Sequence, residues 1–130
     1  MRYLGIDYGH KNIGLAVSDP EGNFVYPYLV ILNNKKTLET IFAICQKEEV
    51  GEIVIGESLN FKGEPNPILE ASKTFAESLR ETTRLPVNFQ IETYSSREAE
   101  RIVGDDDNLD ARAAAIILES YLAQRRKNSK

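Results

Sequence analysis

The order of strand and helix patterns along the chain limits its fold more than any other feature. Three strand patterns come first, separated by turn signals, over residues 3–7, 13–18 and 23–31. Helices and strands then alternate: a helix over 36–49, a strand over 52–56, a helix around 68–79, a strand over 87–91, and helices over about 95–103 and from about 110. Strands joined by short turns favour an antiparallel meander, whereas strands joined by helices favour parallel pairing through right-handed crossovers. The chain therefore predicts an α/β fold: one mixed five-stranded sheet with helices packed on it, as a single domain over residues 1–130.

Local signals mark the ends of several elements. Pro20 fixes φ at a corner and Gly22 tolerates a positive φ at the exit, so residues 19–22 predict a hairpin turn. Gly51 predicts the end of the first helix. The basic run at 125–127 predicts only a frayed helix end, because basic residues suit a helix C-terminus whatever the function.

The cysteine and histidine content limits the chemistry. Cys45 is the only cysteine and His10 the only histidine, so one chain cannot build a disulfide framework, a multi-cysteine zinc site or a pair of histidine ligands. Cys45 also falls on the apolar face of the first helix, which predicts a core thiol. Metal chemistry would therefore depend on oxygen ligands, which favour Mg²⁺ or Mn²⁺.

The net charge of −4 argues against a strong, indiscriminate nucleic-acid binder, because Lys and Arg contacts with phosphate normally supply that affinity. It does not exclude a nuclease, which needs acidic residues to recruit divalent cations and only a few basic residues for phosphate. The chain has no long apolar run and no signal-peptide layout at its N-terminus. We therefore expect a soluble, cytoplasmic protein without membrane contact.

Acidic residues stand at the ends of predicted strands. Asp7 ends the first strand, Glu57 follows the fourth and Glu92 follows the fifth, while Asp110 begins the last helix. In open α/β sheets, ligands collect at the carboxyl ends of strands. Each residue alone is explained as a turn, surface or helix-capping carboxylate. Together they predict a metal site, which suits phosphodiester hydrolysis because two divalent ions stabilise both the attacking water and the leaving oxygen.

Four segments spread over nearly the whole chain form a set of motifs. They read GIDYGHKNIGLAVSD over residues 5–19, LNFKG over 59–63, ETYSSREAE over 92–100 and DARAAAIIL over 110–118. The set resembles the YqgF family, whose members are related to Holliday junction resolvases. The resemblance implies an RNase H-like fold and a metal-dependent nuclease of the two-metal-ion type. It also implies a role in maturing the 5′ end of the small-subunit (16S) ribosomal RNA precursor, with structured RNA and ribosomal precursor particles as partners.

The same resemblance assigns the site. It places the family's three catalytic, metal-binding carboxylates on Asp7, Glu92 and Asp110. Basic and hydroxyl residues near these positions are candidates for substrate binding, and they are Lys11, Lys62, Ser95, Ser96 and Arg97. Each of these also has a simpler interpretation as a solvated surface residue.

Two segments depart from the family pattern. The family usually has Leu-Pro after the glycine of strand four, where this chain has Glu57-Ser58, and Asp-Glu-Arg where this chain has Ile91-Glu92-Thr93. The glutamate is kept but the arginine, a potential phosphate contact, is lost. The related junction resolvases place an acidic ligand at about the end of strand four, which suggests Glu57 as a fourth carboxylate. A solvated loop glutamate is the simpler interpretation.

Three alternatives stay open at this point. A resolvase acting on four-way DNA would need a two-fold dimer to cut symmetrically, and the sequence does not distinguish a monomer from a homodimer. A non-catalytic RNA-binding module could keep the fold and the altered segments. A nucleotide-binding protein is the third, because sugar kinases and actin-like ATPases open with a similar Gly-Ile-Asp-x-Gly hairpin.

Overall fold

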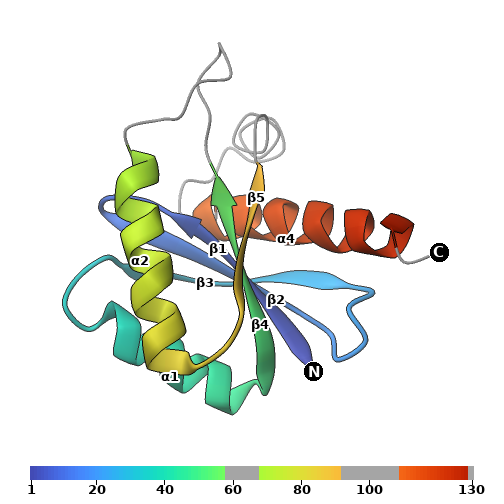
Figure 1. Ribbon diagram of the computed structural model, residues 1–130, viewed down its shortest axis with the longest axis horizontal. Helices are drawn as coiled ribbons and strands as arrows, with labels where there is room; N and C mark the ends of the chain where they lie inside the picture. Colours follow the sequence, from blue (N-terminus) through green and yellow to red (C-terminus); the bar gives the residue numbers. More distant parts are fainter. Residues whose placement is uncertain (58–67, 92–108, 129–130) are drawn as a thin grey trace, which may run out of the picture.

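The computed structural model describes residues 1–57, 68–91 and 109–128 (Figure 1). The elements are β1 (Arg2–Tyr8), β2 (Asn12–Ser18), β3 (Val25–Leu32), α1 (Thr37–Lys47), β4 (Val50–Glu57), α2 (Ile68–Thr83), β5 (Val87–Ile91) and α4 (Leu109–Asn128). The strands form one five-stranded sheet in the order β3-β2-β1-β4-β5. The pairs β1–β2 and β2–β3 are antiparallel, and β1–β4 and β4–β5 are parallel, which confirms the predicted mixed sheet. The helix expected over about 95–103 lies outside the described residues.

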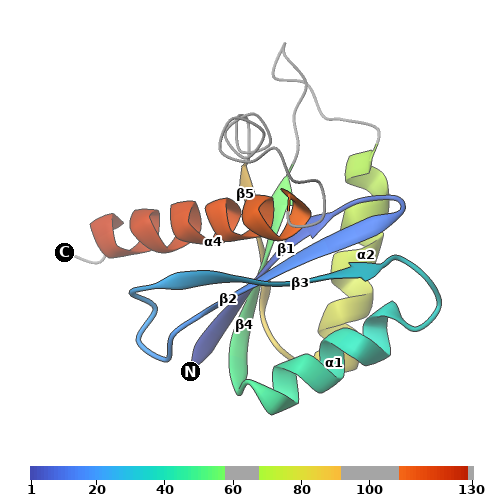
Figure 2. The ribbon, with the colours of Figure 1, turned by 180° about the vertical axis from the view of Figure 1, so that it is seen from behind.

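Helices α1 and α2 cover one face of the sheet, and α4 crosses the other (Figures 1 and 2). Side chains alternate between the two faces of a strand, so each strand contributes to both layers. On β1, Leu4 and Ile6 are fully buried in the core shared with α1 and α2, whereas Gly5 faces α4. None of the helices in the described part of the chain combines the length and apolar character needed to cross a membrane.

The turn between β2 and β3 has the predicted form. The Gly22 amide donates to the Asp19 carbonyl oxygen at 3.1 Å, and Gly22 has a φ of +72°. The Asp19 carboxylate also accepts hydrogen bonds from the amides of Asn23 and Phe24, at 2.7 and 2.9 Å. The bonds from Phe24 and Asn23 lower the pKa of the Asp19 carboxyl. Because these bonds hold both amides in the loop, β3 begins at Val25, two residues later than predicted.

The end of α1 differs from the prediction. The helix ends at Lys47, and the positive φ of 56° that follows belongs to Glu49. Gly51 lies within β4, so the expectation that it ends the helix is wrong. Cys45, by contrast, is 5% exposed, and burial raises the pKa of its thiol to about 11. The predicted core thiol is confirmed.

The basic run near the C-terminus is no frayed end, because α4 continues to Asn128 and its arginines are anchored. Arg125 forms an ion pair of 2.9 Å with Glu52 of β4, a buried carboxylate that also accepts hydrogen bonds from Tyr121 and Asn88. Arg126 donates to the Gly22 carbonyl oxygen at 2.9 Å. Sequence periodicity could not show this, because the partners are distant along the chain.

Candidate active site

Asp7 lies near the carboxyl end of β1, on the face of the sheet that α4 covers. Leu4 and Ile6 belong to the core on the opposite face, and Gly5 contacts α4, so the alternation of the strand places Asp7 on the α4 side. Its side chain is partly exposed. Asp7 is held by β1, the strand at the centre of the sheet.

Gly14 of β2 connects Asp7 to Asp110. It pairs directly with Asp7, and such cross-strand partners have Cα atoms about 4.5–5.5 Å apart and share one face. A Cβ atom built on Gly14 would lie 1.9 Å from the carbonyl oxygen of Asp110 and 2.8 Å from the amide nitrogen of Ala111. The backbone of Asp110 therefore packs directly on Gly14. The backbone of Asp110 thus lies on the face of the sheet to which the Asp7 side chain points.

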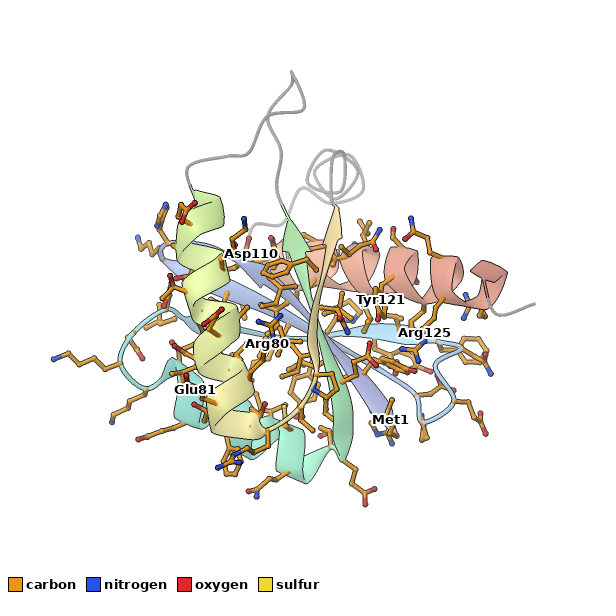
Figure 3. All side chains as sticks on the ribbon, in the orientation of Figure 1. Met1, Arg80, Glu81, Asp110, Tyr121 and Arg125 are labelled. Atoms are coloured by element: carbon orange, nitrogen blue, oxygen red, sulfur yellow. The ribbon has the colours of Figure 1, made fainter. Side chains whose placement is uncertain are left out.

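Small residues allow α4 to approach the sheet this closely. A Cβ on Gly5 would lie 2.8 Å from both the Ala114 carbonyl oxygen and the Leu118 Cβ. Ala111 and Ala114 are buried on the side of α4 that faces the sheet. Asp110 lies in the first turn of α4, and this end of the helix packs on β1 and β2 (Figure 3).

The carboxyl ends of the three parallel strands β1, β4 and β5 lie at the same edge of the sheet. Ile6 of β1 pairs with Ile55 of β4, and Glu57 at the end of β4 pairs with Ile91 at the end of β5. Glu92 follows Ile91 in the sequence and lies outside the described residues. The part of the chain that the structure covers holds no group of three metal-binding side chains, so the third carboxylate stays a prediction.

Lys11 is the only predicted substrate-binding residue within the described ranges. It is exposed in the turn between β1 and β2, at the same edge of the sheet as Asp7. The turn is fixed, because the Asn33 amide donates to the Lys11 carbonyl oxygen at 2.9 Å and the Asn33 side chain donates to the Gly9 carbonyl oxygen at 2.8 Å. Lys62, Ser95, Ser96 and Arg97 lie outside the described residues.

The donor set at this edge fits a hard divalent cation. Asp7 and Asp110 offer carboxylate oxygens, which Mg²⁺ and Mn²⁺ prefer. The thiol of Cys45 is buried in the core on the opposite face, where it cannot serve this site. The close contact leaves no room for a side chain between Gly14, the strand partner of Asp7, and the backbone of Asp110.

Sequence reasoning missed the roles of Gly5 and Gly14. Both belong to the first motif, but their function is to leave space for α4. A signal existed in the pattern: small residues alternate with large apolar ones on β1 and β2, and alanines repeat at helical spacing after Asp110. Matched small residues of this kind indicate a close helix–sheet contact.

Comparison with known proteins agrees with the motifs. The family model described as RuvX, Holliday junction resolvase, matches residues 1–124. A relative from Maridesulfovibrio salexigens, named "Putative pre-16S rRNA nuclease", is 38% identical, and the match covers 95% of this chain and 99% of the relative. A relative from Syntrophomonas wolfei with the same name is 36% identical, with 94% of each chain covered.

Solved structures of low sequence identity show the fold. A Thermus thermophilus RuvC in complex with a Holliday junction substrate matches with a TM-score of 0.64 and 15% identity, over 100% of this chain and 98% of that chain. A fowlpox virus resolvase bound to Holliday junction DNA matches with a TM-score of 0.61 and 13% identity, over 96% and 99%. These matches confirm the RNase H-like fold. With the family model and the relatives together, the chain belongs to the RuvX family, which confirms the YqgF resemblance of its motifs.

Proposed function

We propose that this chain is a metal-dependent nuclease that hydrolyses phosphodiester bonds, as a single RNase H-like domain over residues 1–130. The observation that carries the proposal is the contact of Gly14 with the backbone of Asp110, opposite Asp7. It brings the backbone of Asp110 onto the strand that pairs with Asp7, at the sheet edge where α/β proteins bind ligands, which supports a site built on these two residues. Family membership supports the same activity.

Three carboxylates hold the metal in this proposal: Asp7, Glu92 and Asp110. Two divalent ions, Mg²⁺ or Mn²⁺, would supply positive charge that stabilises the attacking water and the leaving oxygen. The chain's own contribution is position. β1 fixes Asp7, the glycine contact fixes Asp110, and Lys11 binds phosphate on the exposed side of the site.

The proposed substrate is the 5′ end of the small-subunit ribosomal RNA precursor. The names of the relatives from Maridesulfovibrio salexigens and Syntrophomonas wolfei support it, because the match extends over nearly the whole of each chain. Lys62, Ser95, Ser96 and Arg97 are proposed to bind this RNA together with Lys11. We propose a cytoplasmic enzyme that meets its substrate as RNA or in ribosomal precursor particles.

Cleavage of four-way DNA junctions is the second candidate, favoured by the description of the matching family and requiring a homodimer. The test offers purified protein a precursor RNA with its 5′ extension and a four-way DNA junction, each with Mg²⁺, Mn²⁺ or EDTA. We expect metal-dependent cleavage of the RNA. Cleavage of the junction alone supports the second candidate, and no cleavage of either substrate with either metal contradicts the nuclease.

Glu57 provides a separate prediction, because it ends β4 next to the strand that precedes Glu92. If Glu57 is a fourth ligand, Glu57→Gln should raise the Mg²⁺ concentration needed for half-maximal cleavage by about tenfold, the lower end of the effect of altering a metal site's supporting groups. The measurement is cleavage rate against Mg²⁺ concentration. An unchanged midpoint assigns Glu57 to the solvated surface and leaves the three-carboxylate site intact.

A further inference from the structure

A second site lies on the face of the sheet opposite α4. A cavity of about 460 Å³ opens between the end of β1, the segment leading into α1, and α2. Residues 71, 74, 75 and 78 of α2 line it, and their spacing places them on one face of that helix. Tyr8 and Phe75 form an aromatic wall, with ring centroids 4.8 Å apart. Cavities of a few hundred Å³ are typical of sites for small organic groups.

The lining suits an uncharged ring attached to an anionic backbone. None of the described residues that line the cavity is acidic, although the chain has 20 Asp and Glu residues and a net charge of −4. Lys35 is exposed and adds positive charge, and Asn34, Thr74 and Ser78 provide amide and hydroxyl groups. Lys35 therefore attracts an anionic ligand, and no acidic side chain among the described lining residues opposes it.

The cavity and the proposed active site share one strand. Tyr8 lines the cavity and directly follows Asp7, and the two side chains point to opposite faces of β1. The turn after β1 is tied to the cavity wall by the 2.8 Å hydrogen bond from the Asn33 side chain to the Gly9 carbonyl oxygen. A substrate strand held at Asp7 can therefore reach the cavity by passing over the same edge of the sheet.

We propose that this cavity binds an unpaired nucleotide of the substrate strand beside the cleaved bond, an inference that rests on the proposed function. Proteins that hold single strands combine aromatic surfaces for the bases with positive charge for the backbone. Tyr8 provides the first and Lys35 the second. The amide and hydroxyl groups can bind the ribose hydroxyls. A base-paired duplex is too wide for the cavity, so the substrate needs an unpaired segment there.

The test measures binding in an Asp7→Asn background, so that cleavage does not enter the result. Fluorescence anisotropy gives the Kd for a labelled single-stranded RNA and for a blunt duplex of the same sequence. Ala71→Trp fills the cavity and should weaken single-strand binding by about tenfold, the scale of one lost base-stacking contact. Duplex affinity should change little. Ala43→Trp is the matched control, because Ala43 is exposed on α1 and does not line the cavity.

Lys35→Glu tests the charge without filling the cavity. It should weaken single-strand binding and reduce the slope of log Kd against log salt by about one, whereas Lys47→Glu, exposed at the other end of α1, should not. This variant also carries the test if Ala71→Trp fails to fold, as judged by circular dichroism. Single-strand affinity that is unchanged in Lys35→Glu and in folded Ala71→Trp overturns the inference, as does an equal loss in the controls.

The two proposals fail separately. If the unmodified protein cuts neither RNA nor DNA but Ala71→Trp still weakens single-strand binding, the nuclease proposal is wrong and the cavity assignment stands. If the protein cuts RNA while the cavity variants bind single strands normally, the nuclease stands and the cavity has no part in substrate binding.

Discussion

Asp7→Asn should abolish metal-dependent cleavage, lowering the single-turnover rate constant by about a thousandfold or more. The amide keeps the size of the side chain but removes the negative charge that holds a divalent ion. Metal ions contribute several kcal/mol of charge stabilisation to phosphodiester hydrolysis, and each 1.36 kcal/mol corresponds to about tenfold in rate. The measurement is single-turnover cleavage of the precursor RNA and of the four-way junction, with Mg²⁺ and with Mn²⁺.

Glu119→Gln is the matched control, because Glu119 is an exposed carboxylate on α4, the helix that carries Asp110. It should cut at the rate of the unmodified protein. Asp110→Asn should lose activity as Asp7→Asn does. If Asp7→Asn keeps its metal-stimulated rate in a pure preparation, the activity belongs to another site or to a contaminant, and Asp7 is a turn residue.

Gly14→Ala should destabilise the protein and impair cleavage together. The new Cβ would lie 1.9 Å from the Asp110 carbonyl oxygen, so the start of α4 must move away from the sheet. Forcing an atom into a packed contact costs about 1–3 kcal/mol, and backbone on both sides leaves little room for relaxation. We expect a loss near the upper end in urea denaturation, with a lower rate of cleavage because Asp110 moves relative to Asp7.

Gly51→Ala is the control for this substitution. Its Cβ would lie 2.1, 3.0 and 2.9 Å from the sulfur, Cγ and Cβ of Met1, but Met1 is 56% exposed, so the whole residue can shift outward. The free energy of unfolding should therefore change by less than about 1 kcal/mol. Gly14→Ala with unchanged stability and activity would show that the contact with Gly14 does not set the position of Asp110.

The sheet and the helices covering it were predictable because their signals are local. Hydrophobic periodicity marked the strands and α4, and Pro20 with Gly22 marked the hairpin turn. The end of α1 was not predictable, because Glu49 adopts a left-handed conformation that sequence patterns assign to glycine. The anchoring of Arg125 by Glu52 was also missed, since those residues are far apart in the sequence.

In the candidate site, too, local motifs predicted some residues, whereas other features appear only in the folded chain. The motifs identified Asp7 and Asp110, and the structure brings them together through a glycine whose role no local pattern states. The cavity beside Tyr8 was beyond sequence reasoning, because β1, α2 and the segment before α1 meet only in the folded chain. Glu92 remains a prediction of the motif alone.

Substitutions near the C-terminal end of α4 can reduce activity although they lie far from Asp110. The helix rises about 1.5 Å per residue, so Arg125 lies about 22 Å along it from Asp110. The contacts of Glu52 with Tyr121 and Arg125 hold the helix against sliding or rotating at a point remote from Asp110. A random screen for inactive enzyme should recover substitutions at these positions, and such variants would be easily mistaken for defects in substrate binding.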